Sequence, residues 1–374
     1  MAGNHRSNQI YFPPRESNWE RFDSFPARAF QSAIDHALKN ESLLDRNIQR
    51  ALENRAFAEP PPWGDIIGKT RSREDPHGLI ILNGKVAAKW GDTRRPDITF
   101  SVAKSFLSIC AGLLQDDGLI PDFDAPISDL VNDGGFDSPH NKSITWRQMM
   151  QMTSEWQGSM WGKPDQVDHN RDLNFAPKDN ADKGNERALK SPGTHWEYND
   201  VRVNRLALAL LRVAERPLPD LLRERIMDPI GASNDWQWHG YENSWVEINN
   251  QNIQSVSGGS HWGGGMFISS EDQARVGYLI LNKGIWNGER LLSEHYVDQA
   301  FAPCNINEDY GLFWWLNNSQ TRLPSATKTG FCAVGFGSNM IWVEPDYNLV
   351  AVVRWIEGSA FDKFCGEVLE ILKT

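Results

Sequence analysis

A serine and a lysine stand three residues apart, in Ser101-Val-Ala-Lys104, at the start of a long apolar stretch. Apolar residues follow at positions 106, 107, 109, 110, 113 and 114, which is the spacing of a buried helix. Residues three apart on a helix share a face. A serine nucleophile needs a base, and burial can remove the charge of a lysine so that it acts as one. The pair therefore predicts nucleophilic catalysis; the alternative for Ser101 is a structural cap of the helix.

A second match to the same pattern, Ser325-Ala-Thr-Lys328, lies between Pro324 and Thr329-Gly330. No helical pattern follows it, so nothing brings its serine and lysine to one helix face. The context favours Ser101 and Lys104.

Strand signals near both ends of the chain predict the elements that position this pair. Residues 78–91 read as two strands joined at Asn83-Gly84, a strong hairpin signal. Residues 340–343 and 349–355 form a second predicted hairpin, and a closing helix follows at 360–373.

These elements predict a mixed α/β (α+β) fold, in which both termini build one antiparallel sheet flanked by helices. We expect an N-terminal arm and a surface helix in residues 1–75, with the helix at 27–55. The sheet region comprises 76–104 plus 301–374, and a mainly helical region, 105–300, is inserted in it. The active site should lie between the two regions.

Composition limits the classes of partner. The 374 residues carry a net charge of −11, which argues against nucleic acid and anionic membrane surfaces. No stretch has the length of a membrane helix, and the first residues lack the apolar core of a signal peptide. Four cysteines without metal-binding spacing suggest reduced thiols in a cytoplasmic protein. A homodimer is left open.

Four ordered segments identify a family resemblance: residues 99–106, 143–154, 192–201, and 257–267 continuing to 284–292. In order and spacing they resemble the serine β-lactamase-like hydrolases, which include class C β-lactamases, DD-peptidases, related carboxylesterases and 6-aminohexanoate-dimer hydrolases. The resemblance covers roughly residues 75–360. It implies the penicillin-recognising serine hydrolase fold, acylation of Ser101 with Lys104 as its base partner, and no metal or organic cofactor.

The family completes the proton relay with a tyrosine from a Tyr-x-Asn motif. Tyr241-Glu-Asn243 matches literally, but Tyr198 follows Pro192-Gly-Thr as in the family and precedes an apolar helix, so we choose Tyr198. Asp200 then stands where the family has asparagine. An ionised carboxylate cannot donate a hydrogen bond to a β-lactam side chain, which speaks against β-lactamase activity. A helix N-cap is the favoured role of Asp200 over direct substrate contact.

The family's third motif is a strand whose next residue supplies an oxyanion-hole N–H. Lys328-Thr-Gly330 matches literally, whereas Ala333-Val-Gly335 has the spacing of the esterases and is preferred. The oxyanion donors are then the backbone N–H groups of Ser101 and Phe336. Gly335, Asp200 and His261 are the candidates for the substrate pocket, and a structural histidine is the equally weighted alternative for His261.

These observations predict a serine hydrolase that cleaves an ester or amide bond of a small molecule through an acyl-enzyme. Neutral Lys104, coupled to Tyr198, would take the proton of Ser101, and Tyr198 would pass it to the leaving group. The alternatives are a true β-lactamase or DD-peptidase, an acyltransferase, or a non-catalytic binding protein on the same fold.

Overall fold

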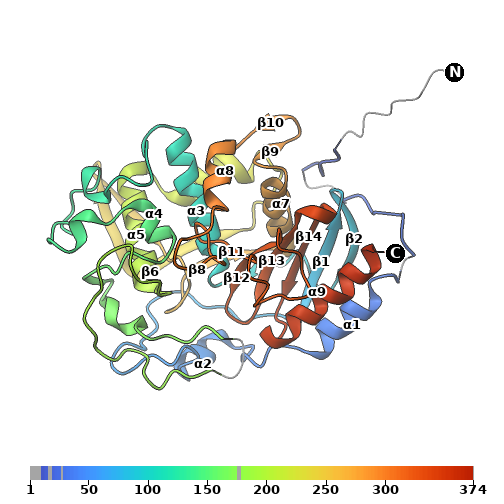
Figure 1. Cartoon of the computed structure of the whole chain (residues 1–374), viewed down its shortest axis with the longest axis horizontal. Coiled ribbons are helices and arrows are strands. Elements are labelled where there is room, and N and C mark those ends of the chain that lie inside the picture. The colour runs from blue at the N-terminus through green and yellow to red at the C-terminus, as the bar shows by residue number, and fades with distance from the viewer. Residues whose placement is uncertain (1–9, 16–18, 27, 175–177, 374) are drawn as a thin grey trace.

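The computed structural model describes residues 10–15, 19–26, 28–174 and 178–373. Its largest sheet has six antiparallel strands drawn from both ends of the chain, as the sequence predicts (Figure 1). In spatial order these strands are β11 (Trp315–Leu316), β12 (Phe331–Gly335), β13 (Asn339–Glu344), β14 (Leu349–Arg354), β1 (His77–Leu82) and β2 (Lys85–Trp90).

Both predicted hairpins are confirmed. β1 and β2 are joined by Asn83 and Gly84, whose φ angles of +48° and +77° suit the tight turn that the right-handed strand twist favours. β13 and β14 pair from Met340–Val353 to Glu344–Leu349 and are connected by the short 3-10 helix η5 (Pro345–Tyr347).

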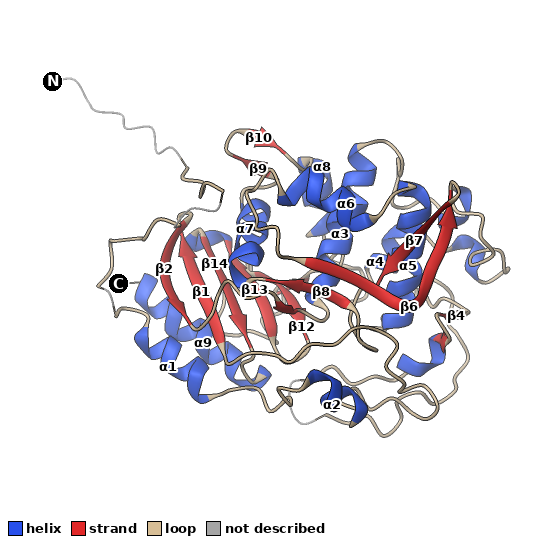
Figure 2. Cartoon of the chain, turned by 180° about the vertical axis from the view of Figure 1, so that it is seen from behind, coloured by secondary structure: helices blue, strands red, loops and turns tan. Residues whose placement is uncertain are grey.

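Helices cover both faces of this sheet (Figures 1 and 2). α1 (Gln31–Lys39) and α9 (Gly358–Leu372) lie side by side, and α9 packs its phenylalanines against Trp342 of β13. α7 (Ser270–Leu281) contacts Ile341 and Val343, which flank Trp342 and therefore point to the opposite face. α3 (Val102–Asp116) also packs on β12 and β13.

The region predicted to be mainly helical, 105–300, contributes three strands to a second, four-stranded sheet, and β3 (Asp97–Ile98) is the fourth. Its strand order is β3, β8 (Gly265–Ile268), β6 (Gln237–Ile248) and β7 (Gln251–Val256). The prediction misses this sheet because the pairing of β6 with β7 is irregular between Gly240 and Trp245, which interrupts the alternation expected of a strand. The helices of this region are α4 (Trp146–Met150), α5 (Asp200–Ala214), α6 (Leu218–Leu222) and α8 (Glu294–Ala300).

The single helix predicted over 27–55 is wrong, because the structure has two shorter helices there, α1 and α2 (Ile48–Glu53). Between them, the chain hydrogen-bonds to the end of β14: the Ser42 amide donates to the Trp355 carbonyl oxygen at 2.8 Å. These backbone bonds replace helical ones. Part of the predicted N-terminal arm, residues 1–9 and 16–18, lies outside the described residues.

The remaining elements are short. They are the ribbons β4 (Ser159–Met160) with β5 (Lys163–Pro164) and β9 (Ile285–Trp286) with β10 (Glu289–Arg290), and the turns η1 (Ile127–Asp129), η2 (Asn141–Ser143), η3 (Asp165–Asp168) and η4 (Arg223–Met227). None of the helices in the described ranges is both long and apolar enough to cross a membrane.

Candidate active site

Ser101 stands at the point where β3 turns into α3. The Thr99 amide bonds to the Met266 carbonyl oxygen of β8, and the next residue, Phe100, turns the chain sharply with a φ of +50°. A positive φ is strained for a bulky side chain and is common at functional sites. Ser101 occupies the N-cap position, but its side chain makes no capping hydrogen bond. The structural alternative for Ser101 therefore does not account for its hydroxyl.

Lys104 reaches back one helical turn to Ser101. Its Nζ lies 2.7 Å from Ser101 Oγ, although the lysine is only 1% exposed. The same Nζ donates a short hydrogen bond to the Asp200 carboxylate. Lys104 is thus one half of a buried ion pair, rather than the isolated neutral amine that burial alone would produce.

Asp200 is not the helix cap that the sequence suggests. Asn199 caps α5, because its side chain accepts hydrogen bonds from the amides of Val201 and Arg202. The Asp200 carboxylate is therefore available to Lys104. Gly259 makes this approach possible, since a Cβ there would lie 2.0 Å from Asp200 Oδ1.

Lys104 and Asp200 belong to a larger group of buried charges, here called the buried ion cluster. Its members contact one another within 4 Å and are Glu59, Lys104, Asp168, Arg171, Lys183, Asp200 and His261. Burial alone would raise the pKa of Asp200, but Lys104, His261 and Arg171 hold it well below its usual value.

Three members of the buried ion cluster, Asp168, Asp200 and His261, offer atoms close enough together to hold a metal ion. Their carboxylates are already paired with the ammonium or guanidinium groups of Lys104, Arg171 and Lys183. Fixed cations at these positions would repel a metal, so the arrangement fits an ion cluster better than a metal centre.

The structure separates the two candidate tyrosines. Tyr198 lines the same cavity as Ser101, and its ring centre lies 4.8 Å from Lys104 Nζ. Tyr241 is buried elsewhere, where its hydroxyl accepts hydrogen bonds from Ser257 Oγ at 2.9 Å and Asn204 Nδ2 at 3.3 Å. Burial also raises the pKa of Tyr241. Of the two candidate tyrosines, Tyr198 therefore shares the cavity with Ser101, whereas Tyr241 does not line it.

The two candidates for the third motif lie at opposite ends of β12. Gly335 ends the strand beside Ser101, since a Cβ there would lie 3.3 Å from the Ser101 amide nitrogen and 2.0 Å from the Thr99 carbonyl oxygen. Gly330 immediately precedes the strand, about 17 Å from Gly335 at the usual rise per residue. Gly335 and Phe336 line the cavity.

The second serine–lysine match has a structural role. The Ser325 amide and hydroxyl both donate to the Asp362 carboxylate of α9, each at 2.9 Å. Lys328 is exposed. Ser325 therefore ties a loop to the closing helix.

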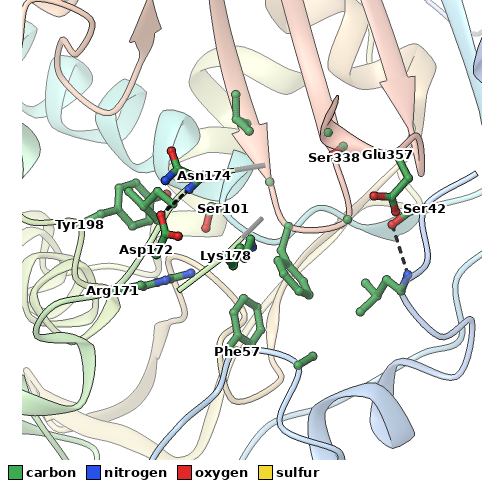
Figure 3. A pocket seen from close by; sticks show the side chains of 18 of the residues that line it. Ser42, Phe57, Ser101, Arg171, Asp172, Asn174, Lys178, Tyr198, Ser338 and Glu357 are labelled. Carbon is green, nitrogen blue, oxygen red and sulfur yellow. Dashed lines mark hydrogen bonds between the residues drawn. The ribbon is translucent and has the colours of Figure 1, made fainter. Parts of the chain in front are cut away.

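Ser101 opens into a cavity of about 370 Å³, in which Figure 3 shows Tyr198 and Arg171 on one side of Ser101 and Ser42 and Glu357 towards the other end. Much of its wall is aromatic or apolar: Leu44, Ala56, Phe57, Leu173, Trp315, Val334 and Phe336. The cavity wall formed by the described residues does not include Asp200 or His261. Their prediction as pocket residues is corrected: both surround Lys104 instead, and of the three pocket candidates Gly335 alone lines the cavity.

The sequence patterns do not identify three residues of the site: Phe57, Glu59 and Arg171. Phe57 packs against Phe336 with ring centres 4.3 Å apart and the rings tilted, and Arg171 bonds to Asp200 Oδ2 at 2.6 Å. Glu59 begins a Glu-Pro-Pro-Pro run that reads only as a helix breaker. No local pattern marks these residues, because they come from loops far from Ser101 in sequence.

The sequence matches the model of a known protein family. The family model described as Beta-lactamase matches residues 83–355, well over half of the chain. One curated sequence, an uncharacterized protein of Alkalihalophilus pseudofirmus, is 30% identical over 97 residues. The match covers 23% of this chain and only 29% of that relative.

Solved structures share the fold. A protein from Bacillus anthracis described as a candidate 6-aminohexanoate-dimer hydrolase has a TM-score of 0.57 at 15% identity, covering 97% of this chain and 88% of that one. A penicillin-binding protein homologue from Caulobacter crescentus has a TM-score of 0.58 at 13% sequence identity, and the match covers 95% of this chain and 99% of that one. A family VIII carboxylesterase has a TM-score of 0.55 at 14% sequence identity, and the match covers 93% of this chain and 98% of that one. At these identities the likeness concerns the fold.

Proposed function

The chain belongs to the beta-lactamase family, and from that premise we propose that it hydrolyses an ester or amide bond of a small molecule through an acyl-enzyme on Ser101. The observation that carries the proposal is the 2.7 Å hydrogen bond between Lys104 Nζ and Ser101 Oγ, beside a cavity that Ser101 lines. A nucleophile that is accessible to a ligand and hydrogen-bonded to a cation, which can stabilise its oxygen as the proton leaves, is suited to acyl transfer.

The ion pair between Lys104 and Asp200 changes the roles expected of Lys104 and Tyr198 in the proton transfer. Asp200 keeps its negative charge, so the Lys104 ammonium is positioned to stabilise Ser101 Oγ as its proton leaves. Tyr198 then accepts that proton. The cations of Lys104 and Arg171 lie 4.8 and 5.4 Å from its ring centre and stabilise the phenol oxygen while it is unprotonated.

The carbonyl oxygen of the substrate gains negative charge when Ser101 attacks. The backbone N–H groups of Ser101 and Phe336 are the proposed donors, and one such donor contributes about 2.7–4 kcal/mol of transition-state stabilisation. Tyr198 next protonates the leaving alcohol or amine. Water repeats the steps in reverse, with Tyr198 as base, and releases the acid.

The position of the Lys-Thr-Gly string supports simple esters and amides over β-lactams. Lys328 of the literal Lys-Thr-Gly string is exposed and lies before β12, whereas Val334, Gly335 and Phe336 line the cavity at the other end of that strand. No lysine from this string is therefore positioned to bind a substrate carboxylate beside Ser101.

One panel of substrates tests the proposal. Purified protein is assayed with p-nitrophenyl esters of increasing acyl length, short amides and nitrocefin, with Ser101→Ala as the control that lacks the nucleophile. We expect ester or amide hydrolysis that Ser101→Ala abolishes, with little nitrocefin turnover.

Other outcomes select an alternative. Nitrocefin turnover comparable to that of esters indicates a β-lactamase, and transfer of the acyl group to an added alcohol or amine in preference to water indicates an acyltransferase. If no substrate reacts and Ser101 is not labelled by a fluorophosphonate, the chain is a binding protein on this fold.

A further inference from the structure

His261 lies between two carboxylates, one at each ring nitrogen. Its Nδ1 is 2.9 Å from Asp200 Oδ2, and its Nε2 forms a short contact with Glu59. A carboxylate accepts hydrogen bonds and cannot donate them when ionised, so each ring nitrogen must carry a proton. The geometry therefore requires the doubly protonated imidazolium form.

The ring of His261 is held in place from both sides. It stacks on Trp262 with ring centres 4.4 Å apart and packs against Phe57 at 4.3 Å. Its side chain is fully buried. A ring clamped in this way fixes the direction of both its N–H bonds, and thus the position of the Asp200 carboxylate that it meets.

The charged groups that face His261 come from four parts of the chain. Asp200 belongs to α5, Asp168 ends η3 and lies 3.6 Å from Nδ1, and Glu59 belongs to the segment before β1. Lys183, from the loop before α5, pairs with Glu59 at 3.1 Å and with Asp168 at 3.3 Å.

The charge balance of the buried ion cluster follows from these contacts. With an imidazolium at His261, the cluster holds four cations and three carboxylates. One positive charge is then in excess, in a buried region where electrostatic effects are strong. It lies next to Ser101 and Tyr198, whose oxygen atoms carry negative charge during the proposed reaction.

We infer that Glu59 and His261 are a positioning pair for the reaction at Ser101: together they fix Asp200 against Lys104 and keep the buried ion cluster positively charged. The inference rests on the proposed function. It also makes the segment before β1 a part of the active site, although Glu59 precedes the residues that match the family model.

The pair has a consequence for pH dependence. Burial opposes the charged ring, but Asp168, Glu59 and Asp200 outweigh it and raise the pKa of His261 above its usual value. Loss of this proton removes the excess charge, so activity should fall on the alkaline side. Without the Glu59 carboxylate, that fall should begin at lower pH.

The first experiment measures ester hydrolysis by Glu59→Gln across pH, with the exposed Glu53→Gln of α2 as the matched control. We expect kcat to fall about tenfold with little change in KM, the range seen for supporting partners of catalytic groups. The alkaline limb should move down by about one pH unit or more. Glu53→Gln should match the wild type in all three measurements.

His261→Asn is the second variant, in case Glu59→Gln does not fold. Its amide can still donate to Asp200 but does not titrate, so the alkaline limb assigned to His261 should disappear. A folded Glu59→Gln with an unchanged kcat and pH profile, or a His261→Asn variant that keeps the limb, overturns the inference.

A third readout does not depend on turnover. Nitrogen-15 NMR of histidine-labelled protein, with His261→Asn to assign the signal, reports whether both ring nitrogens are protonated at pH 7. We expect an imidazolium that titrates at lower pH in Glu59→Gln. A neutral ring in the wild type refutes the positioning pair, whereas absent ester and amide hydrolysis with no labelling of Ser101 refutes the proposed function.

Discussion

Asp200 accepts a hydrogen bond from Lys104, and the same carboxylate bonds to His261 on its other side. The residue that replaces the family's usual asparagine therefore holds the lysine against Ser101 rather than facing a substrate. This placement removes the argument that its charge repels a β-lactam side chain, because Asp200 is only 1% exposed.

Asp200→Asn should lower kcat/KM at least about tenfold, or about 1.4 kcal/mol of transition-state stabilisation. Lys104 and His261 bond to different oxygens of Asp200, so the uncharged asparagine would present its NH2 group, which cannot accept, to one of these two donors. Steady-state kinetics measures the loss, with the exposed Asp220→Asn of α6 as the control. Nitrocefin turnover should not appear in this variant; its appearance would show that residue 200 reaches the substrate.

Ser101 should form a covalent adduct with a fluorophosphonate, because its hydroxyl lies at a cavity wall and is hydrogen-bonded to Lys104. Mass spectrometry of the digested protein locates the adduct. Ser325 is the internal control, since its hydroxyl is bound to Asp362. Labelling at Ser325 in place of Ser101 would contradict the assignment of the nucleophile.

Tyr198→Phe and Lys104→Ala should each lower kcat strongly. The double variant should have a kcat only slightly below that of the less active single variant. Residues that support the same proton transfer, one as acceptor and one by stabilising the charge, are not additive in their effects. A double-mutant cycle on the best ester tests this, and additive losses would show two independent roles.

Tyr241→Phe should leave kcat within about threefold of the wild type and instead reduce stability. The change leaves Ser257 and Asn204 without a buried acceptor, which costs about 1–3 kcal/mol. Urea unfolding alongside kinetics separates the two effects. Loss of activity in a stably folded Tyr241→Phe would reverse the choice between the tyrosines.

Lys328→Ala should change kcat and KM less than about threefold for any substrate, under roughly 0.7 kcal/mol. Lys328 is exposed and precedes β12, whereas the cavity is lined by Val334 and Gly335 at the opposite end of that strand. A sharp rise in KM for substrates that carry a carboxylate would restore the Lys-Thr-Gly string as the third motif.

Acid should destabilise the protein partly through Glu59. Burial would raise its pKa, but His261 and Lys183 lower the pKa of Glu59 to about 2, against 4.5 for an ordinary glutamate. A lowered carboxyl pKa adds stability that is fully present above pH 4.5 and is lost as pH falls towards 2. The shift corresponds to at most about 3 kcal/mol. Denaturant unfolding at several pH values measures this effect. The free energy of unfolding of Glu59→Gln should fall less steeply with acid than that of the wild type, and equal slopes for the two proteins would contradict the ion pairing.

The sequence alone determines the elements with strong local signals. The Asn83-Gly84 turn suits a tight hairpin, and the apolar spacing after Lys104 predicts α3, because backbone conformation and helix periodicity depend on near neighbours. Ser101 and Lys104 lie within hydrogen-bond distance for the same reason. The choice of Gly335 over Gly330 also comes from spacing along one strand.

Only the tertiary structure decides what surrounds Lys104. Asp200, Arg171, His261 and Glu59 come from separate segments, and contacts between segments distant in sequence leave no periodic pattern in any of them. The protonation of a buried group depends on these partners more than on burial itself. For that reason the sequence predicts a neutral lysine, whereas the folded chain surrounds it with charge.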